Sequence, residues 1–423
     1  MPKLALHFIC KNEAHIVTRM LESAKPICDL IVAGDTGSAD GTQQLILQFG
    51  AANSIPTYIF ERPFDNFGDS RNYALQQLLN VVDQLHWDRA DTYGFWADCD
   101  ETFMLNTKFD KDALTADMYN VPGDIEGAPF ARGCFFRLSR DFYWYGPVHE
   151  TIMWKDPTIT VDRLGGISVQ SERVGHSWKS DLEMKYACYG GMLVDFIQKQ
   201  DRGSRWIFYA AQCYFSAAEY TSSEESKQKW LIKALSYYEE RASMVPQRSK
   251  QGVEMEERAY AQLQLATTLH MLGRPWPMVE DAYLKAYRLD PIRGEAFMEI
   301  LRHYETQRNW EHAYGVTRFA VDHFHGKNPL GKRFIGVEPE YYNWRFLWAH
   351  YLVCFHAGKR EEQRDALTRI KLLTKEHPEY FTPEDLLIIR THTPGFLYIG
   401  SALQNCNSII RRLFRHKFRS AEV

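Results

Sequence analysis

The sequence has no long hydrophobic run, no paired cysteine motif and almost no net charge, and each absence excludes a class of protein. No window in the 423 residues reaches the ~18 apolar residues of a membrane-spanning helix. The apolar run at the N-terminus ends at Lys11, too short for the core of a signal peptide. The eight cysteines form no CxxC pair, which argues against a zinc ribbon or a disulfide framework. We therefore expect a reducing, cytoplasmic setting.

The charge balance argues against non-specific binding of polyanions. Lys and Arg number 50 and Asp and Glu number 54, so the net charge is −4 and no overall basic field attracts nucleic acid or an anionic membrane. A composition of 45% hydrophobic and 25% charged residues is ordinary for globular proteins. At about 150 residues per domain, the length corresponds to roughly three domain-sized units.

The first 180 residues have the pattern of an α/β domain. Short apolar runs that end in Gly, Asp or Pro alternate with helical patterns, in the order β-α-β-α-β-α-β. The predicted strands are 4–10, 29–35, 56–61 and 93–98, and the predicted helices between them are 13–24, 42–49 and 69–82. Ligands of such sheets bind beyond the carboxyl ends of the strands. Functional residues are therefore expected at those ends.

After about residue 180 the strand patterns disappear and amphipathic helices follow one another. They are predicted at 205–220, 227–244, 256–272, 278–287, 294–306 and 310–323. Their spacing loosely matches a tetratricopeptide unit of about 34 residues, although the WxxLGxxY signature is absent. We predict an α/β domain at 1–180, a linker helix at 181–204, an all-α repeat domain at 205–395 and a basic amphipathic tail at 396–423.

Carboxylates end two of the predicted strands. Asp98 and Asp100 follow the apolar run YGFWA, and two carboxylates at this spacing suit Mg²⁺ or Mn²⁺ together with substrate phosphates. An isolated DxD is also common in solvated loops, so the motif alone is weak. Asp35 ends the second strand, where it can accept a hydrogen bond from a nucleobase. Ser38 and Asp40 behind it are better explained as helix caps.

Four further residues are candidates on chemical grounds. Arg71 lies early in a helix, where a planar donor can reach a pyrophosphate or a base, although an ion pair with Asp65 or Asp69 is the alternative. His149 and Glu150 follow a Gly-Pro turn and combine a metal ligand or proton acceptor with a carboxylate base. His176 is a second candidate ligand, for which a structural role is at least as good an explanation.

Five ordered motifs together carry a family resemblance. They are KNEA (11–14), DTGSADGT (35–42), FGDSRNYAL (67–75), WADCDE (96–101) and GPVHE (146–150). In this order they resemble glycosyltransferase family 2 enzymes with the GT-A fold, a Rossmann-like α/β fold. The most similar subset carries a tetratricopeptide-like tail and includes the sublancin-type peptide S-glycosyltransferases and lipopolysaccharide core glucosyltransferases. The resemblance covers about residues 3–180, and residues 273–291 resemble the repeats of that subset.

The resemblance assigns the donor-binding residues. Asp35 matches the aspartate that binds the nucleotide base, and Arg71 matches an arginine near the nucleotide. Asp98 matches the first DxD aspartate, near the ribose. Lys11 and Asn12, in the first motif, are assigned to the same donor site.

The resemblance also assigns a metal site and a base. Asp100 matches the aspartate that binds Mn²⁺ or Mg²⁺, and His149 is expected to complete the metal or phosphate site. His176, which the resemblance does not assign, is added to the metal site only as the candidate ligand described above. Glu150 is the first choice for the general base, and Glu101 is the second.

The implied function is inverting, metal-dependent transfer of a sugar from a nucleotide-sugar donor, by family habit a UDP-hexose. The implied acceptor is a peptide, a protein or a surface glycan. Two alternatives stay open. One is the same chemistry on modified nucleic acid, disfavoured because no basic groove is evident. The other is a non-catalytic repeat scaffold with a vestigial GT-A domain.

Two kinds of contact with partners also stay open. The helical repeats offer a surface for binding an extended peptide or for forming a homodimer. The basic amphipathic pattern at 409–418 suits a peripheral contact with an anionic membrane, and a solvated terminal helix is the alternative.

Overall fold

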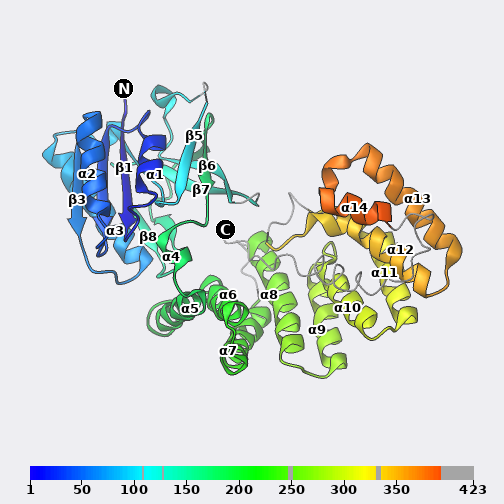
Figure 1. Ribbon diagram of the computed structural model, residues 1–423. Helices are drawn as coiled ribbons and strands as arrows, with labels where there is room; N and C mark the ends of the chain where they lie inside the picture. The colour runs from blue at the N-terminus through cyan, green and yellow to red at the C-terminus, as the bar shows by residue number, and fades with distance from the viewer. Residues whose placement is uncertain (107–108, 126–127, 246–250, 330–334, 392–423) are drawn as a thin grey trace. The chain divides into compact units, whose positions relative to one another are not determined.

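The computed structural model describes residues 1–106, 109–125, 128–245, 251–329 and 335–391 (Figure 1). The chain divides into two compact units after Trp230, and each is described by itself. The predicted fold class, an α/β domain followed by an all-α region, is confirmed. The predicted boundaries of the α/β domain at 180 and of the linker helix at 204 stay predictions. The predicted tail at 396–423 lies outside the described residues.

The first unit is built on a mixed sheet of nine strands. Eight of them follow one another in the order β3-β2-β1-β4-β7-β6-β11-β5, and β10 pairs with β6. A separate hairpin joins β8 to β9. The strands are β1 (Lys3–Cys10), β2 (Leu30–Asp35), β3 (Thr57–Glu61), β4 (Thr92–Trp96), β5 (Glu101–Leu105), β6 (Met118–Ile125), β7 (Ala128–Arg137), β8 (Phe142–Tyr145), β9 (Thr151–Trp154), β10 (Val161–Arg163) and β11 (Ile167–Ser171).

The parallel half of the sheet contains the four predicted strands. β1 lies between β2 and β4, and β3 borders β2, all in parallel. Cys10 lies opposite Asp35, so β1 and β2 end side by side. The other half of the sheet is mixed, with pairings that the sequence pattern did not reveal. β7 pairs antiparallel with β4 and β6, β5 pairs antiparallel with β11, and β6 pairs in parallel with β10 and β11. The loops that follow β1, β2 and β4 therefore emerge at one edge of the sheet.

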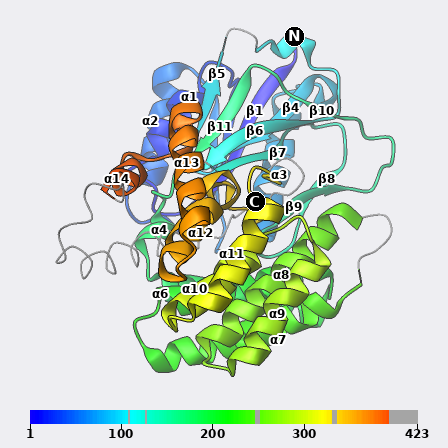
Figure 2. The same cartoon turned by 90° about the vertical axis from the view of Figure 1, so that its right-hand side faces the viewer.

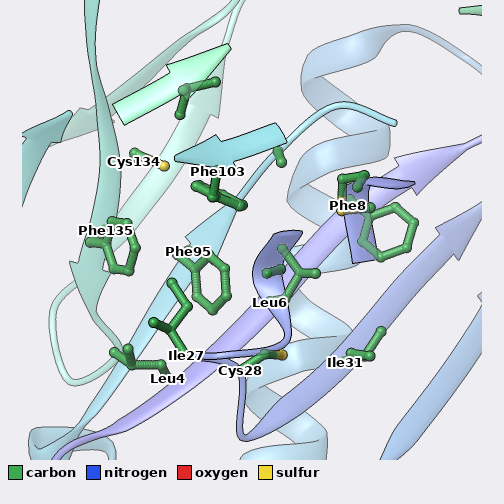
Figure 3. Packing of buried hydrophobic residues seen from close by; sticks show 14 of the residues in the cluster. Leu4, Leu6, Phe8, Ile27, Cys28, Ile31, Phe95, Phe103, Cys134 and Phe135 are labelled. Atoms are coloured by element: carbon green, nitrogen blue, oxygen red, sulfur yellow. The ribbon is translucent and has the colours of Figure 1, made fainter. Parts of the chain in front are cut away.

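Strict alternation in β1 divides the helices between the two faces of the sheet. Leu4, Leu6 and Phe8 belong to one buried cluster, which also receives α1 (Val17–Ala24) and α2 (Thr42–Asn53) (Figure 3). The side chain of Ala5 points to the opposite face and packs in a second cluster, which contains α3 (Phe67–Gln84). Each fully buried Leu or Phe contributes about 1.5–3 kcal/mol. Shorter elements are η1 (Arg89–Asp91), η2 (Lys111–Ala113) and α4 (His176–Lys179).

Two long helices complete the first unit. The predicted linker helix is α5 (Leu182–Lys199), which packs against α6 (Ser204–Tyr220). Trp206 of α6 makes edge contacts with Tyr145 of β8 and Phe196 of α5, at centroid distances of 5.7 and 5.1 Å. These aromatic contacts fix α5 and α6 beside the β8–β9 hairpin. The next helix, α7 (Glu224–Ser243), begins in this unit and ends in the second.

In the described part of the second unit, the regular secondary structure consists of helices joined by turns and short irregular segments. Successive helices pack on one another from α8 to α13, as Figure 2 shows for α8 to α11. The elements are α8 (Gln251–Met271), α9 (Trp276–Leu289), α10 (Glu295–Thr306), α11 (Trp310–Phe324), a π-helical turn η4 (Tyr341–Arg345), α12 (Phe346–His356), α13 (Arg360–Glu376), η5 (Pro378–Tyr380) and α14 (Pro383–Thr391). The predicted helices are confirmed to within a few residues. Among the described residues, no helix combines the length and the apolar character that crossing a membrane requires.

Candidate active site

The loops that follow β1 and β2 are tied together by side-chain hydrogen bonds. The carbonyl oxygen of the Asn12 side chain accepts from the backbone N–H of Ala39 at 2.8 Å, and the backbone N–H of Asn12 donates to Ser38 Oγ at 3.0 Å. Asp40 accepts from the backbone N–H of Ala14 at 3.0 Å. Asn12 has a φ of 58°, in the left-handed region that Asn tolerates best among the larger residues. Hydrogen bonds therefore join the KNEA loop (11–14) to the DTGSADGT loop (35–42) at the edge of the sheet.

Asp35 is a buried carboxylate at the end of β2. Its Oδ1 accepts from the backbone N–H groups of Gly37 and Ser38, both at 2.8 Å, and its Oδ2 lies 3.5 Å from the thiol of Cys10. Burial by itself raises the pKa of Asp35, but the hydrogen bonds from Ser38 and Gly37 outweigh it and hold that pKa below the ordinary value. Asp35 is thus kept ionised and oriented, as a carboxylate that accepts a donor must be.

Arg71 joins two of the predicted site residues. Its Nε donates to Glu150 Oε1 at 2.6 Å and its Nη2 donates to Asp98 Oδ1 at 2.7 Å. The guanidinium also lies over the rings of Trp96 and Trp144, at 4.7 and 5.1 Å from their centroids. With 7% of its side chain exposed, Arg71 is fixed between the two carboxylates and between the two rings.

The alternative ion pair that the sequence suggested for Arg71 is not formed. Asp65 pairs with Arg62, and Asp69 accepts from the side chain of Asn66. Burial acts to lower the pKa of Arg71, but the charges of Asp98 and Glu150 outweigh it and raise that pKa.

A close backbone approach brings Glu150 to Arg71. A Cβ added at Gly68, in the first turn of α3, would lie 2.2 Å from the carbonyl oxygen of Gly146. Gly146 has a φ of 108°, and a Cβ there would lie 2.3 Å from the ring of Trp206. Glycine is therefore required on both sides of this contact. The contact places the GPVHE motif directly against the helix that carries Arg71.

Asp100 and Glu13 lie against the same glycine. A Cβ added at Gly175 would be 3.1 Å from Asp100 Oδ2 and 3.4 Å from Glu13 Oε1. The Glu13 carboxylate accepts from the backbone N–H of His176 at 3.0 and 3.1 Å. His176 itself begins α4 and is exposed. The structure thus brings the backbone N–H of His176 to the Glu13 carboxylate.

The carboxylates near Asp100 create an excess of negative charge. Burial, with repulsion from Asp98, Glu101 and Glu13, raises the pKa of Asp100 to about 8. Burial likewise raises the pKa of Glu13. The pKa of Asp98 is lowered, because attraction from Arg71 and its neighbours outweighs the effect of burial. An oxygen-only donor set with surplus negative charge fits a hard divalent cation such as Mg²⁺ or Mn²⁺.

Glu101 is committed to an internal ion pair. It is 3% exposed, and its two oxygens accept from Arg132 at 2.8 and 2.5 Å. Its Oε2 also accepts from the backbone N–H of Asp98 at 2.8 Å. Burial raises the pKa of Glu101 in spite of Arg132. These contacts fix the turn of the DxD segment, and the role of Glu101 as the second choice for the general base stays a prediction.

His149 faces α6. Its imidazole stacks on Tyr209, with centroids 4.0 Å apart, and its Nε2 lies 3.9 Å from the thiol of Cys213. Its carbonyl oxygen accepts from Arg205 at 3.0 Å. In the described parts of the chain, the predicted ligands Asp100, His149 and His176 do not form a group with donor atoms within 4.8 Å of one another. Their joint metal binding stays a prediction.

The remaining predicted residue and the missed residues complete the site. Lys11 follows β1 and is exposed. The sequence did not single out Glu13 as a candidate site residue, although Glu13 lies in the KNEA motif (11–14). Arg132 was missed because it comes from β7, whose pairing with β4 no local pattern reveals. Its guanidinium lies 3.6 Å from the ring centroid of Trp96, so Arg71 and Arg132 share one aromatic support.

Comparison with known proteins shows only distant likeness. No protein-family model matches the chain, and no curated protein matches it. Among solved structures, residues 1–349 of S. aureus TarS in complex with UDP match at 13% identity and a TM-score of 0.36, covering 67% of this chain and 91% of that one. Yeast Tom70 matches at 12% and 0.34, covering 54% and 39%. MamA matches at 12% and 0.31, covering 48% and 98%. Similarity at this level carries no statement about the activity of this chain.

Proposed function

We propose that this protein is an inverting, metal-dependent glycosyltransferase that uses a nucleotide-sugar donor, with a UDP-hexose as the first donor to test. One observation carries the proposal: Asp35, Asp98 and Asp100 lie at the carboxyl edge of the parallel strands, with Arg71 linking Asp98 to Glu150. Nucleotides bind at this edge in doubly wound sheets. The five ordered sequence motifs support the same assignment.

The nucleotide-sugar donor is assigned to the surface formed by the joined loops after β1 and β2. Asp35, held ionised by Gly37 and Ser38, accepts a hydrogen bond from the nucleobase. Asp98 keeps 39% of its side chain exposed while its Oδ1 accepts from Arg71, so it can also receive a ribose hydroxyl. Lys11 and Asn12 lie in the first of these two loops. The donor is then oriented before the reaction, which lowers the entropic part of the barrier.

The chemical step is a single displacement. Glu150, oriented by Arg71 at 2.6 Å, takes the proton of the acceptor nucleophile. The acceptor lone pair forms the bond to the anomeric carbon as the bond to the diphosphate breaks, and the electron pair leaves with the diphosphate. Mg²⁺ or Mn²⁺ held by Asp100 would supply charge neutralisation of that leaving group. Arg71 and Arg132 place further positive charge beside the DxD segment.

The acceptor is proposed to be a peptide, a protein or a surface glycan, with the helical region contributing to its recognition. Extended repeat surfaces bind extended ligands or a second copy of the same chain. The contact proposed for the basic segment 409–418 with an anionic membrane involves residues outside the described part of the chain and stays a prediction.

Hydrolysis of the donor in the absence of an acceptor tests the proposal. A panel of UDP-, GDP- and dTDP-sugars is incubated with the protein and Mn²⁺, Mg²⁺ or EDTA, and the released nucleoside diphosphate is measured. We expect release from one donor, loss of release with EDTA, and loss in Asp100→Asn. Asp112→Asn, an exposed aspartate in η2, is the matched control and keeps full activity. No release from any donor, with no nucleotide binding by calorimetry, would overturn the proposal in favour of a repeat scaffold.

A further inference from the structure

A second cluster of metal-ligating groups lies in the helical unit, within α12 and α13. His350 and Cys354 are one helical turn apart on α12, and Glu362 stands early in α13. His350 Nε2 lies 3.4 Å from Cys354 Sγ and 3.5 Å from Glu362 Oε2. Within the described ranges, this is the one group of three or more such residues whose donor atoms all lie within 4.8 Å of one another.

The imidazole of His350 is oriented by a buried threonine. Thr317 Oγ1 lies 3.0 Å from His350 Nδ1, and the Thr317 hydroxyl donates its one proton to the carbonyl oxygen of Tyr314 at 3.2 Å. With its proton placed there, the threonine oxygen accepts from the Nδ1–H, which is the tautomer that the proposed site requires. This arrangement places the proton of a neutral imidazole on Nδ1 and the lone pair on Nε2, the atom that faces Cys354 and Glu362. A second partner on the distal ring nitrogen is typical of histidines that bind metals.

Glu362 is oriented in the same way. The hydroxyl of Tyr314 donates to Glu362 Oε1 at 2.7 Å, which leaves Oε2 directed at His350 Nε2. With the proton on Nδ1 both Nε2 and Oε2 can bind one ion, whereas with the proton on Nε2 the imidazole donates to Glu362 instead. Cys354 Sγ completes the group and is fully buried. Donor atoms of three different types thus lie within 4.8 Å of one another.

The distances suit tetrahedral zinc. With Zn–N of about 2.05 Å, Zn–S of about 2.3 Å and Zn–O of about 2.1 Å, a regular tetrahedron separates N from S by about 3.5 Å and N from O by about 3.4 Å. The observed separations are 3.4 and 3.5 Å, and because Cys354 Sγ also lies 3.8 Å from Nδ1, over the face of the ring, zinc binding requires a rotation of the Cys354 side chain. A thiol sulfur and an imidazole nitrogen select zinc over the hard cations that carboxylates alone would bind.

We propose that His350 Nε2, Cys354 Sγ and Glu362 Oε2 bind a Zn²⁺ ion that joins α12 to α13. The thiol proton of Cys354 passes to solvent as the Zn–S bond forms, and the other two ligands bind through lone pairs. The Glu362 side chain is 43% exposed, which gives the ion a path from solvent to the two buried ligands. The fourth position is left to water or another ligand. This site is separate from the proposed transferase chemistry.

Cobalt substitution tests the site directly. The full-length reduced protein is stripped with a chelator and titrated with Co²⁺, whose charge-transfer band in the near ultraviolet reports a bound thiolate. We expect one equivalent to produce the band and one equivalent of Zn²⁺ to abolish it. Zn²⁺ should also raise the melting temperature, because it binds the folded state. Absence of the band in the wild-type protein would overturn the proposal and leave a thiol–imidazole hydrogen bond in its place.

Matched variants separate this site from the other cysteines and from the proposed active site. Cys354→Ser should abolish the band, whereas Cys28→Ser, at another buried cysteine, should keep it. Asp100→Asn should also keep it, so failure of the transferase proposal does not affect this result. Glu362→Gln, at a partly exposed position where the fold tolerates change, should weaken Co²⁺ binding at least about tenfold, the lower end of the loss on removing an outer partner. An unchanged band in Cys354→Ser would contradict the assignment.

Discussion

The sheet edge and the α12–α13 pair gather metal-binding groups in opposite ways. At the sheet edge, Asp98, Asp100 and Glu13 come from loops after two different strands, and all are carboxylates. In the helical unit, His350 and Cys354 come from one turn of one helix. Parallel strands bring distant loops together, whereas a helix brings together residues four apart in sequence. The first arrangement suits a hard cation that binds with its substrate, and the second suits a resident zinc ion.

The two clusters also differ in how they balance charge. The carboxylates at the sheet edge are partly neutralised by Arg71 and Arg132, which are held by aromatic rings. The α12–α13 cluster is oriented by the neutral hydroxyls of Thr317 and Tyr314. Loss of an arginine should therefore destabilise the first site strongly, whereas loss of a hydroxyl should mainly weaken metal binding in the second. The predictions below test this difference.

The largest expected effect is on catalysis at the sheet edge. Glu150→Gln keeps an oxygen that accepts from Arg71 but removes the proton acceptor. We expect donor hydrolysis to fall about 10²–10⁴-fold, the usual contribution of a general base, with unchanged affinity for the nucleoside diphosphate. Kinetics and calorimetry measure the two quantities. Glu61→Gln, an exposed residue at the end of β3, is the control. Wild-type hydrolysis in Glu150→Gln would eliminate Glu150 as the base.

The next effect tests whether the arginine bridge stabilises the fold. Arg71→Leu leaves Asp98 and Glu150 without their buried partner, and we expect the free energy of unfolding to fall by about 3–5 kcal/mol. Arg62→Leu is the matched control, because its ion pair with Asp65 is more exposed and contributes at most about 1 kcal/mol. Chemical denaturation of both variants gives the difference. Equal losses would show that burial does not distinguish the two pairs.

The sequence predicted the parallel half of the first unit well, because local patterns determine it. The apolar runs before Asp35 and Asp98 and the amphipathic helices between them follow from spacing alone. In the other half of the sheet, β7 pairs with β4 and β11 pairs with β5 and β6 over long stretches of sequence, so the strand order depends on contacts that no short window contains. Arg132 could not be found for this reason, since it reaches Glu101 across that half of the sheet.

The helical cluster was missed for a different reason. A search for CxxC pairs excludes zinc ribbons but does not detect a ligand set of three residue types in which each type occurs once. His350 and Cys354 have helical spacing, so they can be recognised as neighbours once a helix is predicted. Glu362 joins them only because α13 turns back on α12. That packing, and the orientation of His350 by Thr317, require the structure.

A third prediction sharpens the comparison in the helical unit. Thr317→Val keeps the buried shape but removes the oxygen that accepts from His350 Nδ1. We expect affinity for Co²⁺ and Zn²⁺ to fall about 10–100-fold, as when other outer partners of ligating histidines are removed. Competition with a chromophoric chelator measures the change. Thr368→Val, at an exposed position on α13, should leave affinity unaltered. Equal affinity in Thr317→Val would mean that the threonine does not orient the ring.

The smallest effect tests how tightly the sheet-edge carboxylates are packed. Gly175→Ala adds a methyl group 3.1 Å from Asp100 Oδ2 and 3.4 Å from Glu13 Oε1, so one of the carboxylates must shift by a few tenths of an ångström. A displacement of 1 Å in an active site lowers rates by about 10²-fold, so for this smaller shift we expect the rate of donor hydrolysis to fall about tenfold. Gly165→Ala is the control, since nothing lies within 4 Å of its added Cβ. A rise in the Mn²⁺ concentration needed for half-maximal hydrolysis would locate the defect at Asp100. Unchanged kinetics would show that the carboxylates can shift without cost to the reaction. The side chains at the sheet edge would then be less rigidly held than those of the α12–α13 cluster.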